Sequence, residues 1–398
     1  MRIHLKNFRS IQELEMEIGP ITVIYGHNGS GKSSILYALQ VMKNIVLNPN
    51  QQVDNFFNLG FTNLGGFEQV VFKHDKRRKV LLEIEVKYKE KKMRYGVFVG
   101  ERDGRFILSE GMVVKKKEFV CDVSFPYPAN KGVDILFFKV DGKSISSRWD
   151  GLTLHSPRGV PAEIQEKANE YLEIYNAPAE MVRKFTLIPL KRGFSKPTYS
   201  PMATTPTPYT EDEIATLLGN DAYFEEKVNS YCQQVFKKDF RVRPKIGTSI
   251  FSLMVGEKGL ATELVNEGFG LNQAVFMFAM MLKEKGSLVG IEEPEIHLHP
   301  TAQRELVHSF IKMVREEGIT IILTTHSENI LSALLSAVAT KKIAPKDVAC
   351  YLCTKTTKEG TKIERQEVNE KGQIKGGLGS FMEAELKDLK EMLAASGE

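Results

Sequence analysis

The feature that most restricts the fold of this chain is an octapeptide that matches G-x-x-x-x-G-K-[ST] at every defined position: Gly26-His27-Asn28-Gly29-Ser30-Gly31-Lys32-Ser33. An apolar run at residues 21–25 precedes it, and a helical pattern begins at Lys32 with its apolar residues on one side. Glycines in such a loop let successive backbone N–H groups converge on phosphates, and the helix N-terminus adds partial positive charge. The sequence therefore predicts a strand, a phosphate-binding loop and a helix, in that order.

This loop defines the first half of a nucleotide site. Lys32 is expected to reach the β- and γ-phosphates of ATP, and the hydroxyl of Ser33 is expected to bind Mg²⁺. A glycine-rich turn without a ligand is the alternative, but it leaves an unpaired lysine at a helix start unexplained. The expected nucleotide contacts are Gly26, His27, Asn28, Gly29, Ser30, Gly31, Lys32, Ser33 and Ser34.

Two acids form the next group of candidates. Residues 287–291 are an apolar run that predicts a buried strand, and Glu292 and Glu293 follow it directly. The first carboxylate can hold Mg²⁺ through its waters, and the second can polarise the attacking water. Acids at a strand end are common as solvated charge, so these two gain weight only from the motifs around them. Glu292 stands where an aspartate is usual.

A histidine ends the next buried strand, in Thr324-Thr325-His326-Ser327. One strand on from the two acids, His326 could donate a hydrogen bond to a γ-phosphate and respond to its loss. A helix-capping or core histidine is the alternative, and it would be preferred if His326 stood alone.

A second glycine-rich loop opens a helix at Asn266-Glu267-Gly268-Phe269-Gly270-Leu271-Asn272-Gln273. The first phosphate loop does not need it, so one chain carries two half-sites. Two chains related by a two-fold axis could complete two whole sites, each nucleotide held between Lys32 of one chain and Gly268 and Gly270 of the other. A turn with glycine in a special backbone conformation is the alternative.

Periodicity indicates the rest of the organisation. Alternation between residues 68 and 150 predicts an antiparallel sheet, with a hairpin turn at Asp141-Gly142. A proline-rich break at residues 193–209 predicts an exposed loop or linker. Further helices are predicted at 162–185, 211–236, 271–282, from Pro300, at 327–340 and from Ser380, and a hairpin at 348–353 and 362–368.

Composition adds little that is specific. The chain has 398 residues and a formal net charge of +4, and no stretch reaches the roughly 18 apolar residues of a membrane span. Cys350 and Cys353 form C-x-x-C within a predicted strand, where they point to opposite faces, which disfavours a metal site.

Basic runs could contact nucleic acid, but solvated hairpin tips are the preferred interpretation. These runs are 76–79, 89–94, 115–117 and 237–245.

Taken together, these motifs resemble the ABC-type AAA ATPases related to the overcoming-lysogenization-defect (OLD) family and, more distantly, RecF and SMC-type heads. The opening Leu5-Lys6-Asn7-Phe8-Arg9-Ser10 contributes to the resemblance. It implies that Arg9 lies near the nucleotide, that Gly268 and Gly270 form the signature loop, that Glu293 is the catalytic base and that His326 is the switch histidine. Gln69 is the candidate for the family's metal-binding Q-loop glutamine.

Three departures narrow the resemblance. Coiled-coil arms of the SMC type are absent, a proline-rich segment standing in their place. The residues after His326 lack the glutamate and Asp-x-Asp of the Toprim domain in OLD nucleases. The L-S-G-G-Q of transport ABC proteins is also absent.

The sequence thus predicts an α/β P-loop NTPase, an ABC-ATPase head with an antiparallel β subdomain and a helical signature lobe. The expected parts are a nucleotide-binding lobe (1–192 and 285–398), a linker (193–209) and a helical lobe with the signature loop (210–284). ATP and Mg²⁺ would close a cytoplasmic, head-to-tail homodimer that acts on a protein effector or nucleic acid in DNA repair or genome defence, without a membrane partner. A direct DNA-binding ATPase and a small-molecule P-loop kinase are the alternatives.

Overall fold

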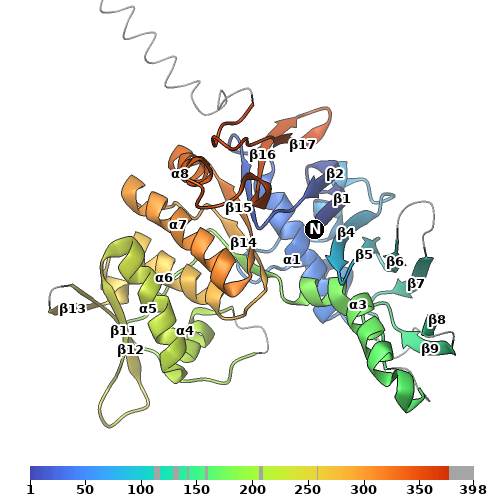
Figure 1. Ribbon diagram of the computed structural model, residues 1–398, viewed down its shortest axis with the longest axis horizontal. Helices are drawn as coiled ribbons and strands as arrows, with labels where there is room; N and C mark the ends of the chain where they lie inside the picture. The colour runs from blue at the N-terminus through green and yellow to red at the C-terminus, as the bar shows by residue number, and fades with distance from the viewer. Residues whose placement is uncertain are drawn as a thin grey trace, which may run out of the picture. The chain divides into compact units, whose positions relative to one another are not determined.

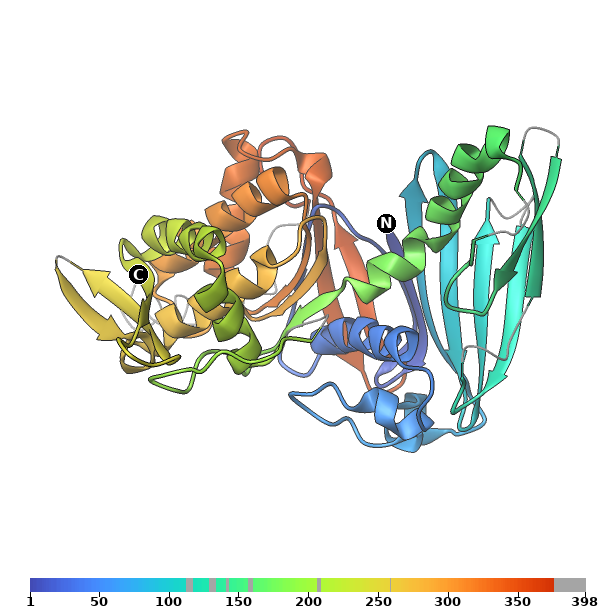
Figure 2. The same ribbon diagram turned by 90° about the horizontal axis from the view of Figure 1, so that it is seen from below.

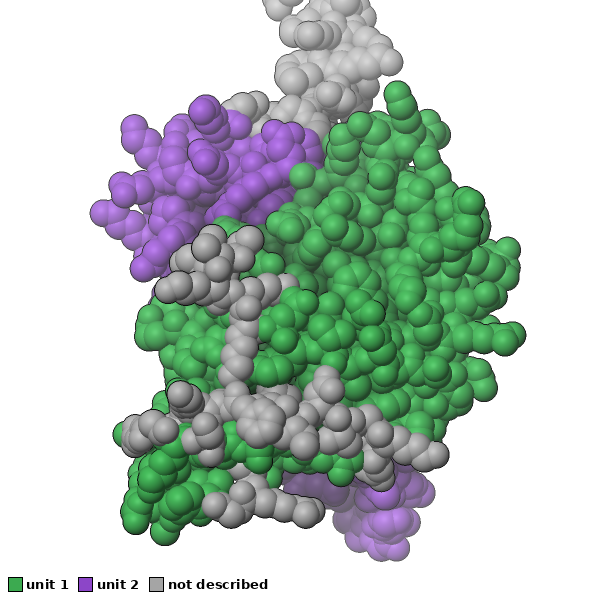
Figure 3. All heavy atoms as spheres, turned by 90° about the vertical axis from the view of Figure 1, so that its right-hand side faces the viewer, with its two compact units in different colours: residues 1–18, 33–185, 354–363 green, residues 19–32, 186–353, 364–398 purple. Residues whose placement is uncertain are grey.

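A computed structural model of the chain describes residues 1–111, 117–128, 134–140, 143–156, 160–205, 209–257 and 259–375 (Figure 1). The chain divides into two compact units. Unit 1 comprises 1–18, 33–185 and 354–363, and unit 2 comprises 19–32, 186–353 and 364–398 (Figure 3). Lys115 and Lys116, the Asp141-Gly142 turn, Pro206, Pro208 and the helix expected from Ser380 lie outside the described residues.

Unit 1 is built on a six-stranded antiparallel sheet in the order β2-β1-β4-β5-β6-β7. The predicted alternation is confirmed, because Leu82 and Ile84 on β4 and Tyr95 and Val97 on β5 are buried on one face. Helix α3 (Gln165–Arg183) contacts β4 and β5 and crosses the sheet (Figure 2). The strands are β1 (Arg2–Phe8), β2 (Ile11–Glu17), β4 (Val80–Tyr88), β5 (Lys91–Val99), β6 (Asp103–Glu110) and β7 (Lys117–Ser124), with a separate hairpin of β8 (Asp134–Val140) and β9 (Lys143–Trp149).

The remaining helices of unit 1 are α1 (Lys32–Leu47), whose first residue belongs to unit 2, and the short α2 (Phe67–Val70). The apolar side predicted for α1 is confirmed, since Ile35, Leu36 and Ile45 are fully buried.

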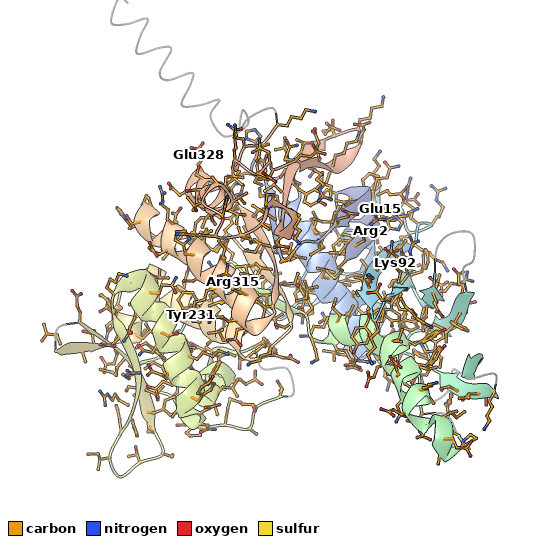
Figure 4. The ribbon with its side chains drawn as sticks, in the orientation of Figure 1. Arg2, Glu15, Lys92, Tyr231, Arg315 and Glu328 are labelled. Carbon is orange, nitrogen blue, oxygen red and sulfur yellow. The ribbon has the colours of Figure 1, made fainter. Side chains whose placement is uncertain are left out.

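Charged side chains of unit 1 form ion pairs on the sheet and in the segments next to it. Figure 4 labels three charged side chains of the sheet, Arg2 on β1, Glu15 on β2 and Lys92 on β5. Many of the cations in the basic runs 76–79 and 89–94 have carboxylate partners. The pairs are Lys76 with Glu68 and Glu101, Arg77 and Arg78 with Asp75, Lys79 with Asp103, Lys89 with Glu170 and Glu173, Lys91 with Glu110, and Arg94 with Glu85. These contacts favour the interpretation of the runs as solvated hairpin tips.

Unit 2 contains a parallel sheet in the order β10-β14-β15-β3-β16. Strands β3 (Ile21–Tyr25) and β14 (Leu288–Glu292) are buried along their whole length, as parallel strands covered on both faces require. Strand β10 (Thr186–Ile188) was not predicted as a strand, because three residues are too few to show periodicity. The other strands are β15 (Thr320–Thr325) and β16 (Val348–Thr356). Strand β17 (Gly360–Gln366) follows β16, and residues 354–363 of these two strands and their turn belong to unit 1.

The helices of unit 2 are α4 (Glu211–Asn220), α5 (Ala222–Phe236), α6 (Phe269–Leu282), α7 (Pro300–Glu317) and α8 (Glu328–Ala339). A three-stranded sheet, β11 (Asp239–Pro244), β12 (Phe251–Glu257) and β13 (Leu260–Glu263), lies in the same unit. The predicted helical lobe and the strand that ends in Glu292 therefore share one compact unit, and the functional boundaries at 192, 209 and 284 remain a prediction. Among the described residues, no helix has the length and apolar character of a membrane-spanning segment.

The proline-rich segment is attached more firmly than the sequence suggested. Its described residues form no helix or strand, as predicted, but Phe194 and Tyr199 are buried, which corrects the expectation of an exposed loop. The buried carboxylate of Glu213 on α4 accepts hydrogen bonds from the N–H and hydroxyl of Thr205 and from the N–H groups of Tyr209 and Thr210. Burial alone would raise the pKa of Glu213, but these hydrogen bonds outweigh it and lower the pKa to about 2.

Glu213→Gln is therefore expected to lower the free energy of unfolding by about 2–3 kcal/mol at neutral pH, because an amide places donors against donors. The folded pKa lies below the ordinary 4.5, so the contribution of Glu213 is complete above that value and is lost as the pH falls toward 2. Urea unfolding between pH 7 and pH 3 measures both effects. Asp212→Asn, which breaks only the exposed pair with Lys196, is the control, and an equal loss in both variants would contradict the prediction.

Candidate nucleotide-binding site

The phosphate loop joins β3 to α1, as its motif predicts. Gly26, Gly29 and Gly31 have φ of 142°, 75° and 103°, a region that disfavours side chains. A Cβ atom at Gly26 would also overlap the backbone of Cys353 on β16. The glycines thus serve both the curvature of the loop and its close fit against the neighbouring strand.

Lys32 is buried and folded back against its own loop. Its Nζ donates hydrogen bonds to the carbonyl oxygens of Gly26 at 2.8 Å and His27 at 3.0 Å. Burial lowers the pKa of Lys32, and the charges of Glu293 and Glu295 act in the opposite direction. The ammonium group is therefore held beneath the loop by carbonyl groups with which a phosphate could compete.

The two acids occupy the carboxyl end of β14. Glu292 is buried, and the N–H of Leu190 donates to its Oε2 at 3.3 Å. Glu293 follows with a φ of 40°, a left-handed conformation that a residue with a side chain rarely adopts. Such strained residues gather at functional sites, where the surrounding structure holds them in place.

His326 follows β15 and meets Glu293 directly. The Nε2 atom of His326 lies 3.0 Å from Oε1 of Glu293. Burial and the nearby charge of Lys32 lower the pKa of His326, so its ring is neutral at neutral pH and the contact is between an uncharged imidazole and a carboxylate. The structure thus brings together the predicted base, the predicted switch histidine and Lys32, all in unit 2.

Sequence reasoning gave no role to two further residues at this edge. The buried Glu295 accepts hydrogen bonds at Oε1 from the hydroxyl of Thr325 and from the N–H of His326. Arg192, after β10, donates to the backbone carbonyls of Glu292 and Glu293. A single arginine after a three-residue strand belongs to no motif, so only its position after the apolar residues 187–188 could have drawn attention to it.

The second glycine loop lies at the start of α6. Gly268 is exposed with an ordinary φ of −58° and nothing within 4 Å of a Cβ atom, and Phe269 is 74% exposed. Gly270 is buried, and a Cβ atom there would overlap the carbonyl oxygen of His297. Neither glycine has a positive φ, so the alternative of a turn with special backbone geometry is wrong.

Arg9 and Gln69 belong to unit 1, and their roles remain predictions. The guanidinium of Arg9 lies 5.3 Å from the ring centroid of Tyr37, and the backbone N–H of Arg9 donates to the carbonyl of Val70. Gln69 is exposed on α2.

The residues fit a magnesium-bound nucleotide in donor chemistry. The described residues contain no group of three or more His, Cys, Asp or Glu side chains that could hold a metal. Mg²⁺ bound to phosphates needs only one or two protein oxygens, however, and the carboxylate of Glu292 is such a hard donor. The buried hydroxyl of Thr324, paired in register with Glu292, has no hydrogen-bond partner among the described residues and is available to a bound water or ligand.

Residues 21–332 match the sequence family described as "AAA domain, putative AbiEii toxin, Type IV TA system". This match covers the phosphate loop, the second glycine loop, the two acids and His326. The chain belongs to this family. It is accordingly a P-loop ATPase domain, and the resemblance to ABC-type AAA ATPases related to the OLD family is confirmed.

Similar proteins include a sequence relative over a short segment and solved structures over most of the chain. The chain is 42% identical over 41 residues to an OLD nuclease of Thermus scotoductus, a match that spans 10% of this chain and 8% of that protein. A structure of an SMC head bound to the C-winged helix domain of ScpA aligns over 93% of this chain and 98% of its own, with a TM-score of 0.50 and 13% identity. The SMC head domain of Thermotoga maritima aligns over 92% and 98%, with a TM-score of 0.42 and 11% identity. At such identity the SMC likeness concerns the fold alone, and it confirms the predicted fold class.

Substitutions of the two glycines of the second loop are expected to change the stability of the protein by different amounts. Gly270→Ala should lower the free energy of unfolding by about 1–3 kcal/mol, because the methyl group overlaps the carbonyl of His297. Gly268→Ala should change it by less than about 0.5 kcal/mol, since its surroundings are open. Thermal unfolding of the two variants without nucleotide measures the difference, and equal stability of the two would contradict the packing described for α6.

Proposed function

We propose that this chain binds ATP with Mg²⁺, hydrolyses it to ADP and phosphate, and uses the reaction as a conformational switch. The observation that carries the proposal is the contact of Glu293 with His326, 3.0 Å apart at the sheet edge from which the phosphate loop also starts. Family membership supports nucleotide use, and this pair supports chemistry at the γ-phosphate.

In the proposed reaction a water attacks the γ-phosphorus while the bond to the oxygen shared with the β-phosphate breaks. Glu293 takes the proton of this water, and ADP leaves with the electron pair of the broken bond. Lys32 would stabilise the charge on the phosphates. Ser33 and Glu292 would hold Mg²⁺, which supplies charge neutralisation on the phosphate oxygens when bound.

His326 is proposed as the sensor of the γ-phosphate. In the structure Nε2 of His326 lies 3.0 Å from Oε1 of Glu293, and the backbone N–H of His326 donates to Glu295. A γ-phosphate offers a competing acceptor, so ATP and ADP would leave different partners on the same ring. This difference in hydrogen bonding is what could bias two conformations of the protein.

The second glycine loop supports a sandwich of two chains. Gly268 and Phe269 are exposed at the start of α6, where N–H groups and partial positive charge favour a phosphate of another molecule. We propose that each ATP lies between the phosphate loop of one chain and the Gly268–Gly270 loop of the other. Closure of this dimer around ATP would be the switched state.

A protein effector in repair or genome defence is the favoured target of the switch. Direct nucleic-acid binding is favoured less, because many cations of the basic runs are already paired with carboxylates. A P-loop kinase would leave the second glycine loop without a role.

Glu293→Gln is expected to reduce ATP turnover by about 10²–10⁴-fold while leaving the affinity for ATP within a few fold. Glutamine keeps the shape and an acceptor for His326 but does not take up a proton. Phosphate release and equilibrium binding of a labelled ATP analogue measure the two quantities. Lys32→Ala should instead abolish stable binding, and Glu316→Gln, an exposed acid on α7, should change neither. Undiminished turnover in Glu293→Gln would remove the proposed base.

The Glu293→Gln protein is also expected to double in mass with Mg-ATP, as seen by light scattering, because the bound ATP is not consumed. Gly268→Glu in this background should prevent the dimer without weakening ATP binding by a single chain. The structure makes Gly268 a sharper test than Gly270, since a side chain at Gly270 disturbs its own chain. Thr262→Glu, an exposed position on β13, is the control.

Mixing two inactive chains tests the same arrangement. With Glu293 intact, a Lys32→Ala chain and a Gly268→Glu chain should together recover about one working site per heterodimer. The Gly268→Glu chain supplies the phosphate loop, and the Lys32→Ala chain supplies the second glycine loop. A mixture that stays inactive, or a Glu293→Gln protein that stays monomeric with saturating Mg-ATP, would contradict the sandwich.

A further inference from the structure

Arg192 is a half-buried cation whose hydrogen bonds are directed at the backbone of the two acids. Its Nη1 donates to the carbonyl of Glu292 at 2.6 Å and to that of Pro189 at 3.0 Å. Its Nη2 donates to the carbonyl of Glu293 at 2.9 Å. One planar guanidinium therefore holds two consecutive carbonyl groups at the end of β14.

These bonds explain how an unfavourable conformation persists. Glu293 has a φ of 40°, which a side chain disfavours. When the carbonyls on both sides of the Cα atom of Glu293 are fixed, the φ of Glu293 and the direction of its side chain are fixed with them. That direction is the one that brings its Oε1 to His326.

Arg192 remains protonated although its surroundings lower its pKa. Burial lowers the pKa of Arg192 to about 10, and the neighbouring charges of Glu295, Glu292 and Glu293 act in the opposite direction. The side chain is therefore cationic at neutral pH, and its bonds to the carbonyls are charge-assisted.

The segment that carries Arg192 is also attached to α6. The N–H of Phe194 donates to Oδ1 of Asn272 at 2.7 Å, and Nδ2 of Asn272 donates back to the carbonyl of Phe194 at 2.9 Å. Asn272 lies in the first turn of α6, shortly after Gly268 and Gly270. Gly193, between the two attachments, has a φ of 123°, and a Cβ atom there would approach Oδ1 of Asn272 to 2.7 Å.

We infer that Arg192 is a positioning residue for the carboxylate of Glu293, and that residues 192–194 link this carboxylate to the second glycine loop at the start of α6. The inference rests on the proposed role of Glu293 as the base. In the proposed dimer, the second glycine loop contacts the phosphate of a nucleotide bound by the other chain. If this contact moved the start of α6, the movement would pass through Asn272 and Phe194 to the carbonyls that orient the base. Hydrolysis would then depend on how the second loop is engaged, beyond the contact of that loop with the nucleotide.

Arg192→Lys is the first test, because an ammonium group keeps the charge but lacks the fork that spans two carbonyls. The expected kcat for ATP falls about 10–100-fold, with KM and the melting temperature close to those of the unchanged protein. Lys191→Met, at the exposed neighbouring position, should leave kcat unchanged. A kcat within about 2-fold of the unchanged protein, or losses of kcat, ATP affinity and stability in parallel, would overturn the positioning role.

Gly193→Ala provides a second variant that keeps both Arg192 and Asn272. The methyl group displaces the link, so kcat should again fall about 10-fold with ATP affinity retained. An unchanged kcat in this folded variant would overturn the link to α6.

A double variant separates this inference from the proposed function. If Arg192 acts through Glu293, Arg192→Lys should cause no further loss in a Glu293→Gln background, measured as single-turnover hydrolysis of labelled ATP. A further loss of about 10-fold would overturn the inference, while the proposed base would stand. If Glu293→Gln alone keeps full turnover, the proposed function and the inference both fail.

Discussion

The parallel pairing of β10, β14, β15 and β3 is the constraint on which the candidate site depends. Because each ladder runs parallel, the chain leaves all four strands at one edge of the sheet. The register sets Glu292 beside Thr324 and Thr324 beside Ile24, so these strand ends are level. Residues as distant in the chain as Gly26 and His326 therefore belong to one site.

Backbone groups supply most of the hydrogen-bond partners of the charged side chains at this edge of the sheet. Lys32 donates to carbonyls of its own loop, and Arg192 donates to carbonyls at the end of β14. Glu295 accepts from the N–H of His326 and the hydroxyl of Thr325. Buried ions without such partners would strongly destabilise the fold. The same partners orient the side chains, so the hydrogen bonds that stabilise these charges also set the geometry of the candidate site.

The glycines of the two loops show that glycine can be required at a motif position for different structural reasons. Gly26 meets both a backbone and a packing demand, since its φ is 142° and Cys353 leaves no room for a side chain. Gly270 meets only a packing demand, against the carbonyl of His297. Gly268 meets neither within its own chain, which is the observation expected of a residue that faces another molecule.

Four features could be predicted from the sequence alone, because each follows from local periodicity or from a motif with fixed spacing. They are the nucleotide loop between β3 and α1, the strands that end in Glu292 and Thr325, the period-two alternation of unit 1 and the α/β class. The sequence could not reveal β10, which is too short to carry a period, or the burial of Phe194 and Tyr199 within an irregular segment. Only the tertiary structure decided that Arg192 fixes the strained backbone of Glu293 and that Glu295 holds His326. Hydrogen bonds of this kind join residues that are neighbours across strands and loops, and no spacing along the chain encodes which carbonyl a buried side chain will reach.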